Sequence, residues 1–124
     1  MAKVSLLVDT DIFIEYFNQG RFHALFDSTR FTVYYSIITK KELLTKPGLR
    51  DAERESILTE LSRCRLIALS DSIATRYSDL RRRHPSLDQG DALIAATALV
   101  KRLPLMTRNK RHFRMVIGLT LFGE

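Results

Sequence analysis

The alternation of apolar and polar positions divides the chain into short apolar runs and longer amphipathic stretches. Residues 4–8 form an apolar run that ends at Asp9, a pattern that predicts a short buried strand. Residues 32–35 are rich in β-branched and aromatic side chains, which favour a second strand. Further strands are predicted at residues 66–69 and 105–107, with a last one near residues 119–122.

Apolar residues recur at helical spacing between these runs. Ser36 and Ser70 are natural N-caps, while Pro47 and Pro85 end the helices that precede them. The predicted helices cover residues 12–17, 22–26, 36–46, 51–64, 70–84, 88–102 and 110–114. Strands that alternate with helices predict an α/β fold of three layers, α/β/α, with a central parallel sheet of four or five strands.

The helix predicted at residues 88–102 is unusual in its pattern. From Ala92 onward it is apolar nearly all the way round, which is typical of a helix buried on every side. It nevertheless begins with two carboxylates, Asp88 and Asp91, which share one face of the first turn. Helix capping and a functional role explain Asp88 equally well. For Asp91 we expect partner acids elsewhere in the chain, because converging carboxylates bind divalent metals.

Length and composition narrow the class of protein. The 124 residues make one domain, residues 1–124, and the 45% hydrophobic and 27% charged content is typical of globular proteins. No apolar run reaches the roughly 20 residues needed to span a membrane, and the run before Asp9 is shorter than that of a signal peptide. We therefore expect a soluble cytoplasmic protein. The single cysteine, Cys64, excludes an intrachain disulfide or a cysteine metal site.

The net charge of +6 is concentrated in the last third of the chain. No acidic residue lies between Asp91 and Glu124, whereas six basic residues do: Lys101, Arg102, Arg108, Lys110, Arg111 and Arg114. A basic surface of this kind favours a polyanionic partner, nucleic acid first. The separate cluster of residues 81–84 is better explained as a solvated helix end.

Several acids are expected at the carboxyl ends of the strands, where open parallel sheets bind ligands. Asp9 follows the first strand directly and could simply cap the next helix, but we expect it to bind metal because Asp11 could do the capping. Glu42 lies at the edge of the apolar face of its helix and becomes a plausible third acid beside Asp9 and Asp91. Asn109 follows the fourth strand, where it serves equally well as an oxygen ligand or as a helix cap.

The chemistry of these groups points to a hard metal ion. Packed carboxylates repel one another unless a cation neutralises them, and oxygen ligands favour Mg²⁺ or Mn²⁺ over Zn²⁺. A site of this kind beside a basic surface suits hydrolysis of a phosphodiester bond.

Four segments, taken together and in this order, resemble a PIN domain, specifically a VapC-type toxin of a toxin–antitoxin pair. The segments are residues 6–11, the helix of residues 36–44 that carries Glu42, residues 91–98, and Thr107-Arg108-Asn109 followed by His112-Phe113. The similarity covers essentially the whole chain and implies a PIN-like fold. It also implies a magnesium-dependent endoribonuclease, with Mn²⁺ as an alternative cofactor, that cuts RNA and is silenced by a VapB-type antitoxin.

The resemblance also assigns roles to individual residues. It implies that Asp9, Glu42 and Asp91 bind metal and activate water, and that Thr10 and Thr107 orient acids or phosphate. Asn109 stands where the family often has a fourth acid, and Asp88 is an accessory residue without a clear counterpart. Arg108, Lys110 and Arg111 are the expected RNA-binding residues. The family commonly forms homodimers, which agrees with apolar residues expected at the surface, such as Phe22 and Leu49.

Two other interpretations compete with this one. The sequence Asp9-Thr10-Asp11 after a buried strand is similar to the nucleophile motif of haloacid-dehalogenase-like phosphatases. Those enzymes usually have threonine or valine where this chain has Phe13, and their downstream lysine and paired acids are not evident here. The second alternative is a PIN-like protein that binds RNA or a partner without cutting, because Asn109 lowers the charge of the site. The presence of all three acids argues against it.

Overall fold

The strand that precedes Asp9 lies inside a parallel sheet of four strands with the order β3-β2-β1-β4. The computed structural model describes residues 3–123. The strands are β1 (Val4–Val8), β2 (Phe31–Ser36), β3 (Arg65–Ile67) and β4 (Leu105–Met106). Leu7 of β1 pairs with Tyr34 on one side and with Leu105 on the other, so the carboxyl ends of β1 and β4 lie together.

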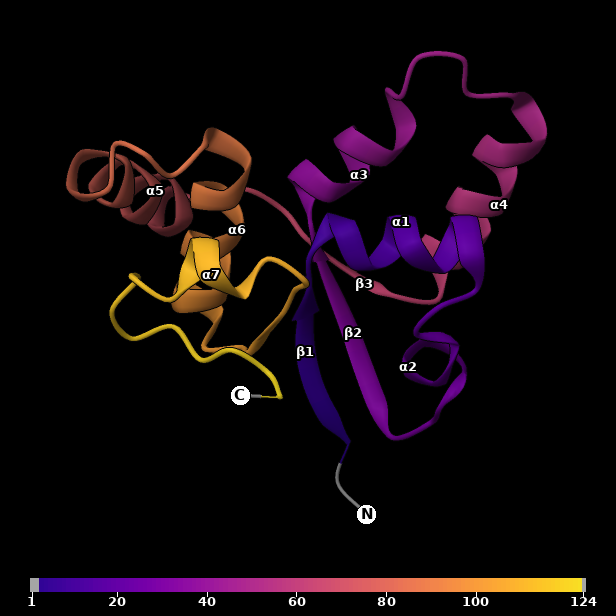
Figure 1. Ribbon diagram of the computed structural model, residues 1–124, viewed down its shortest axis with the longest axis horizontal. Coiled ribbons are helices and arrows are strands. Elements are labelled where there is room, and N and C mark those ends of the chain that lie inside the picture. Colours follow the sequence, from indigo (N-terminus) through magenta and orange to yellow (C-terminus); the bar gives the residue numbers. More distant parts are fainter. Residues whose placement is uncertain (1–2, 124) are drawn as a thin grey trace.

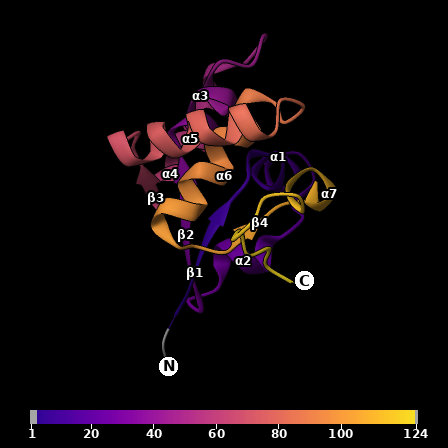
Figure 2. The ribbon, with the colours of Figure 1, turned by 90° about the vertical axis from the view of Figure 1, so that its left-hand side faces the viewer.

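Helices cover both faces of this sheet, as predicted (Figure 1). They are α1 (Thr10–Gln19), α2 (His23–Asp27), α3 (Ile37–Leu44), α4 (Asp51–Ser62), α5 (Asp71–Arg83), α6 (Gln89–Lys101) and α7 (Lys110–Phe113). The layer of α1 to α4 lies on one face, and α5, α6 and α7 lie on the other (Figures 1 and 2). Within the described part of the chain, no helix is both long enough and apolar enough to cross a membrane.

Two apolar cores hold these layers to the sheet. Side chains alternate along a strand, so Leu6 and Val8 of β1 pack in the core beneath α1 to α4, whereas Leu7 packs in the core beneath α5 to α7. Helix α6 forms much of the second core: Ala92, Ala95 and four further residues on its length are at most 2% exposed. The prediction of a helix buried along nearly its whole circumference is confirmed.

Several element boundaries differ from the prediction, and three of the differences have a visible structural reason. Strand β3 ends at Ile67, because its partner β2 ends at Ser36 and offers no further backbone to pair with. Leu69, predicted within this strand, is 58% exposed. Helix α3 stops at Leu44 rather than Lys46, since the Thr45 hydroxyl donates to the Lys41 carbonyl at the C-cap. The last predicted strand is reduced to a single parallel bridge between Leu105 and Leu121.

Two residues expected at the surface lie against the core instead. Phe22 and Leu49 are partly buried and pack with the side chains beneath α1 to α4. They therefore offer no support for a homodimer, which stays a prediction.

Candidate functional site

Asp9 is held in place by both of its carboxylate oxygens. It leaves β1 with extended backbone angles and forms the N-cap of α1, where Oδ1 accepts a hydrogen bond from the Thr10 N–H at 2.7 Å. Oδ2 accepts one from the Thr107 hydroxyl, also at 2.7 Å, and the residue is 4% exposed. The expectation that Asp11 would cap this helix is wrong, because Asp11 already lies in the first helical turn.

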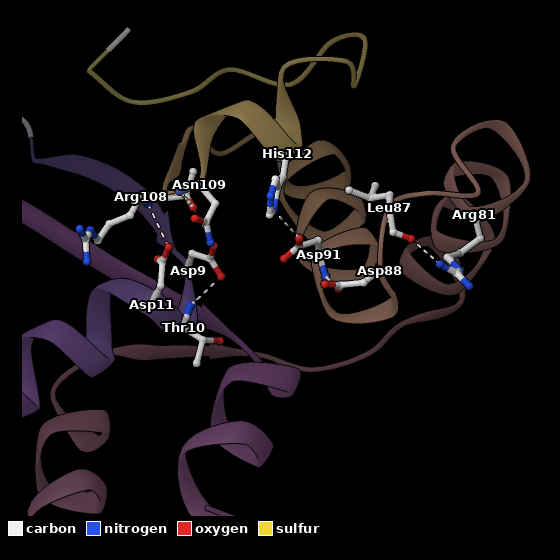
Figure 3. Close-up of polar contacts among 11 residues, drawn as sticks. Asp9, Thr10, Asp11, Arg81, Leu87, Asp88, Asp91, Arg108, Asn109 and His112 are labelled. Atoms are coloured by element: carbon white, nitrogen blue, oxygen red, sulfur yellow. Dashed lines mark hydrogen bonds and ion pairs between the residues drawn. The ribbon is translucent and has the colours of Figure 1, made fainter.

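Asp11 was not among the predicted site residues, yet it lies beside Asp9. Its Oδ2 accepts a hydrogen bond from the Arg108 N–H at 3.1 Å (Figure 3). Its Oδ1 is the only buried side-chain oxygen or nitrogen in residues 3–123 that has no hydrogen-bond partner. Such an oxygen is rare, because an unpaired buried acceptor is costly. The sequence signal was the second acid of Asp9-Thr10-Asp11, which we had interpreted as a cap.

Glu42 reaches the same edge of the sheet from α3. Its Oε1 accepts a hydrogen bond from the Thr10 hydroxyl at 2.8 Å, and that hydroxyl also lies 2.8 Å from the Thr39 hydroxyl. Glu42 further approaches α6: a methyl group on Gly90 would lie 3.7 Å from Glu42 Oε2 and 3.5 Å from Asp88 Oδ1. Both carboxylates would thus contact a side chain at Gly90, which places Glu42 and Asp88 close to the first turn of α6.

The first turn of α6 presents Asp91 toward Asp9 (Figure 3). Asp88 is the N-cap of this helix and accepts a hydrogen bond from the Asp91 N–H at 2.8 Å, which confirms its capping role. Asp91 Oδ2 lies 3.4 Å from His112 Nδ1 of α7. His112 belongs to the last of the four segments that resemble a PIN domain, but the sequence does not predict it as a site residue.

Burial and mutual repulsion perturb three of these acids. Burial raises the pKa of Asp9 to about 7, and the charges of Asp11 and Asp91 add to that effect against the hydrogen bonds from Thr107 and Thr10. Burial also raises the pKa of Asp91, helped by Asp88 and opposed by His112. Burial also raises the pKa of Asp11, and the hydrogen bond from the Arg108 N–H partly offsets this rise. Each acid would hold its charge more readily if a cation lay among them.

The segment after β4 carries the remaining predicted residues. Asn109 occupies the N-cap position of α7, as one of its two interpretations predicted, although its side chain makes no capping hydrogen bond. The Arg108 guanidinium forms an ion pair with Glu15 of α1. Lys110 Nζ lies 3.4 Å from the Gly123 carbonyl, and Arg111 is exposed.

A hard divalent cation fits the chemistry of this donor set. The predicted donors are all oxygens, the charges of Asp11 and Asp91 act on Asp9, and Asp11 Oδ1 has no hydrogen-bond partner among residues 3–123. As the side chains lie, no three His, Cys, Asp or Glu residues within positions 3–123 are grouped tightly enough to hold a metal. Mg²⁺ usually keeps several waters and binds one or two carboxylates directly, which suits acids spaced in this way.

Comparison with known proteins gives a consistent result. The family model of the PIN domain matches residues 6–117. The chain is 31% identical to Ribonuclease VapC1 of Methanocaldococcus jannaschii, over 96% of this chain and 88% of that protein. A toxin–antitoxin complex from Klebsiella pneumoniae has a similar chain, with TM-score 0.77 and 30% identity over 93% of this chain and 95% of that one. VapBC2 from Rickettsia felis, bound to a promoter DNA fragment, has the same fold, with TM-score 0.81 and 22% identity over 95% and 97% of the two chains.

Proposed function

The chain belongs to the PIN domain family, and on that premise we propose that it is a metal-dependent endoribonuclease, the toxin of a VapBC-type pair. The observation that carries this proposal is that Asp9, at the carboxyl end of β1, lies close enough to Asp91 of α6 for their charges to interact, while Glu42 of α3 accepts a hydrogen bond from the neighbouring Thr10. The similarity to a VapC ribonuclease over nearly the whole chain supports the same activity.

We propose that Asp9, Glu42 and Asp91 hold Mg²⁺ or Mn²⁺, with the amide oxygen of Asn109 available as a neutral ligand. The bound ion would polarise the phosphate and lower the pKa of a water molecule. Thr10 and Thr107 fix the orientation of the acids, because each hydroxyl donates to one carboxylate, Glu42 and Asp9 respectively. Asp88 acts indirectly, by capping the turn that presents Asp91.

The RNA would approach over α7, where basic residues lie beside the acids. Lys110 and Arg111 stand in this helix, one turn or less from His112, which contacts Asp91. Cations at these positions would contact phosphates and position the strand without reading its bases.

The direct test is cleavage of single-stranded RNA by the purified chain with Mg²⁺, beside the Asp91→Asn variant. We expect discrete new 5′ ends with the wild type and none with Asp91→Asn or with excess EDTA. Glu55→Gln, which neutralises an exposed acid on α4, is the matched control and should cut like the wild type. A folded Asp91→Asn protein that cuts at the wild-type rate would refute the site. Binding of RNA by a wild type that never cuts it would favour the non-cleaving alternative.

The proposed partner is a VapB-type antitoxin, and a groove between α1, α3 and α4 offers it a binding site. The groove encloses about 610 Å³, its lining includes Ile14, Phe17 and Leu49, and Thr10 and Glu42 lie within it. Ile14 is 45% exposed, so apolar surface is available to a partner. We propose that an apolar antitoxin segment fills this groove and directs a basic side chain to Glu42. The segment would then block the site and neutralise its charge.

An Ile14→Asp variant tests this surface. It should still cut RNA but should no longer be inhibited by a co-expressed VapB-type antitoxin. Ile117→Asp, at an 88% exposed residue outside the groove, should remain inhibited. Equal inhibition of both variants would place the antitoxin elsewhere. Light scattering of the free chain would test the predicted homodimer.

A further inference from the structure

The segment Thr107–Asn109 is tied to α1 at several points. The Thr107 hydroxyl donates to Asp9 Oδ2, and the Arg108 N–H donates to Asp11 Oδ2. The Asn109 N–H donates back to the Thr107 hydroxyl at 3.0 Å. The segment that follows β4 therefore takes its position from α1, and not only from the short strand before it.

Arg108 is held by its side chain as well as by its backbone. Its guanidinium forms an ion pair with Glu15, and Figure 3 shows the side chain directed away from Asp91. Asp11 and Glu15 are four residues apart on α1 and so lie on one face of that helix. The Glu15 side chain is only 17% exposed, and its other oxygen lies 3.5 Å from Arg21. One helical face thus contacts both ends of the same arginine.

We propose that Asp11 and Glu15 clamp Arg108, so that Arg108 and Glu15 are positioning residues rather than RNA contacts. The inference rests on the proposed ribonuclease function. Arg108 lies between Thr107, which orients Asp9, and Asn109, which faces the site. A shift of Arg108 therefore displaces both neighbours. An arginine that is already paired with an acid has less charge to offer a phosphate, and Arg108 is paired with Glu15.

The two roles predict opposite effects for the loss of Glu15. If Glu15 clamps Arg108, both Glu15→Ala and Arg108→Ala lower kcat by about ten- to a hundredfold, because small misplacements at a reacting centre are costly. KM and the salt dependence of RNA binding stay unchanged. The kcat of the double variant falls no further than that of either single variant, since each single substitution already removes the same contact. If Arg108 binds RNA, Arg108→Ala raises KM and Glu15→Ala leaves kcat unchanged or improves binding.

Matched variants separate the clamp from a general loss of structure. Arg21→Ala removes the second partner of Glu15, together with the contact of the Arg21 guanidinium with the Phe22 ring, and leaves Arg108 untouched, so its kcat should equal that of the wild type. Glu15→Gln keeps an oxygen for the guanidinium and should recover part of the kcat lost in Glu15→Ala. An Arg21→Ala variant as impaired as Glu15→Ala would overturn the proposal.

A measurement without RNA distinguishes failure of the clamp from failure of the proposed function. Hydrogen exchange of the Asn109 N–H reports the position of the segment, because this group is bonded to Thr107. We expect exchange at least about tenfold faster in Glu15→Ala and Arg108→Ala, and unchanged in Arg21→Ala, consistent with local opening. Unchanged exchange in all three variants would refute the clamp even in an active ribonuclease. Faster exchange in Glu15→Ala and Arg108→Ala, together with a wild type that cuts no RNA, would preserve the clamp and refute only the function.

Discussion

Neutralising Asp9 is predicted to stabilise the metal-free protein at neutral and alkaline pH. Burial, with help from Asp11, raises the pKa of this 4% exposed carboxyl to about 7, from an ordinary value of 3.8 that the unfolded chain should show. The folded state therefore binds this proton more tightly. The free energy of unfolding should fall as the pH rises from about 4 to about 7, and the loss is complete above that range. Asp9→Asn has no proton to release there.

The size of the effect follows from the two pKa values. A difference between 3.8 and about 7, at about 1.36 kcal/mol per pH unit, amounts to about 4 kcal/mol at pH 8. The asparagine can preserve the local contacts, because its oxygen can accept from the Thr10 N–H and its amide can donate to the Thr107 hydroxyl. The new hydrogen bond to Thr107 should be weaker than the one it replaces. We therefore expect the free energy of unfolding of Asp9→Asn to exceed that of the wild type by about 2 to 4 kcal/mol at pH 8 and to differ little at pH 4.

Urea unfolding in EDTA, at pH values from 4 to 9, measures this difference directly. The wild type should lose stability across the window, while Asp9→Asn should show a flatter profile. Glu55→Gln, at an exposed position, controls for the loss of one negative charge and should follow the wild type. If the two stability profiles are parallel and Asp9→Asn is no more stable than the wild type at pH 8, the pKa of Asp9 is not raised in the folded state.

Three further predictions concern the same edge of the sheet. A hundredfold excess of Mg²⁺ over its Kd should stabilise the wild type by about 2.7 kcal/mol in thermal unfolding at pH 8, and most of this gain should disappear in Asp9→Asn and Asp91→Asn. Thr107→Val should lower the free energy of unfolding, measured in urea at pH 8, by about 2 kcal/mol, because it removes the donor to Asp9. Thr107→Ser keeps this donor and should be nearly as stable as the wild type. Lys110→Ala and Arg111→Ala should each reduce the salt slope of RNA binding by about 0.7, and an unchanged slope would remove that residue from the RNA surface.

The periodicity of the sequence predicted the layers of the fold more reliably than the ends of its elements. The apolar run of β1 and the apolar circumference of α6 depend on which faces are buried, and burial acts on many residues at once. The end of β3 depends instead on where its neighbour β2 stops, which is a non-local property. Leu69 is apolar but has no strand beside it, so the pattern extended the strand two residues too far.

The sequence indicated candidate site residues where a side chain directly follows a strand or lies in the first turn of a helix. Asp9 and Asp91 are of this kind, and the structure brings Glu42 to the same edge through Thr10. The partners of Arg108 were not predictable, because Glu15 is separated from it by most of the chain. A basic residue in a basic segment suggested an RNA contact, and only the tertiary structure shows the acid beside it.

The choice of Asp at position 9 is itself an argument for a cation. Helix capping needs only an oxygen acceptor, and serine or asparagine would satisfy the Thr10 N–H without a buried charge. The chain instead keeps an acid whose pKa is raised to about 7, next to Asp11, whose Oδ1 has no partner within the described residues. Such an arrangement destabilises the metal-free fold near neutral pH, so capping alone does not explain it. A divalent cation would offset the repulsion and satisfy the acids, which supports the proposal of a metal site at Asp9.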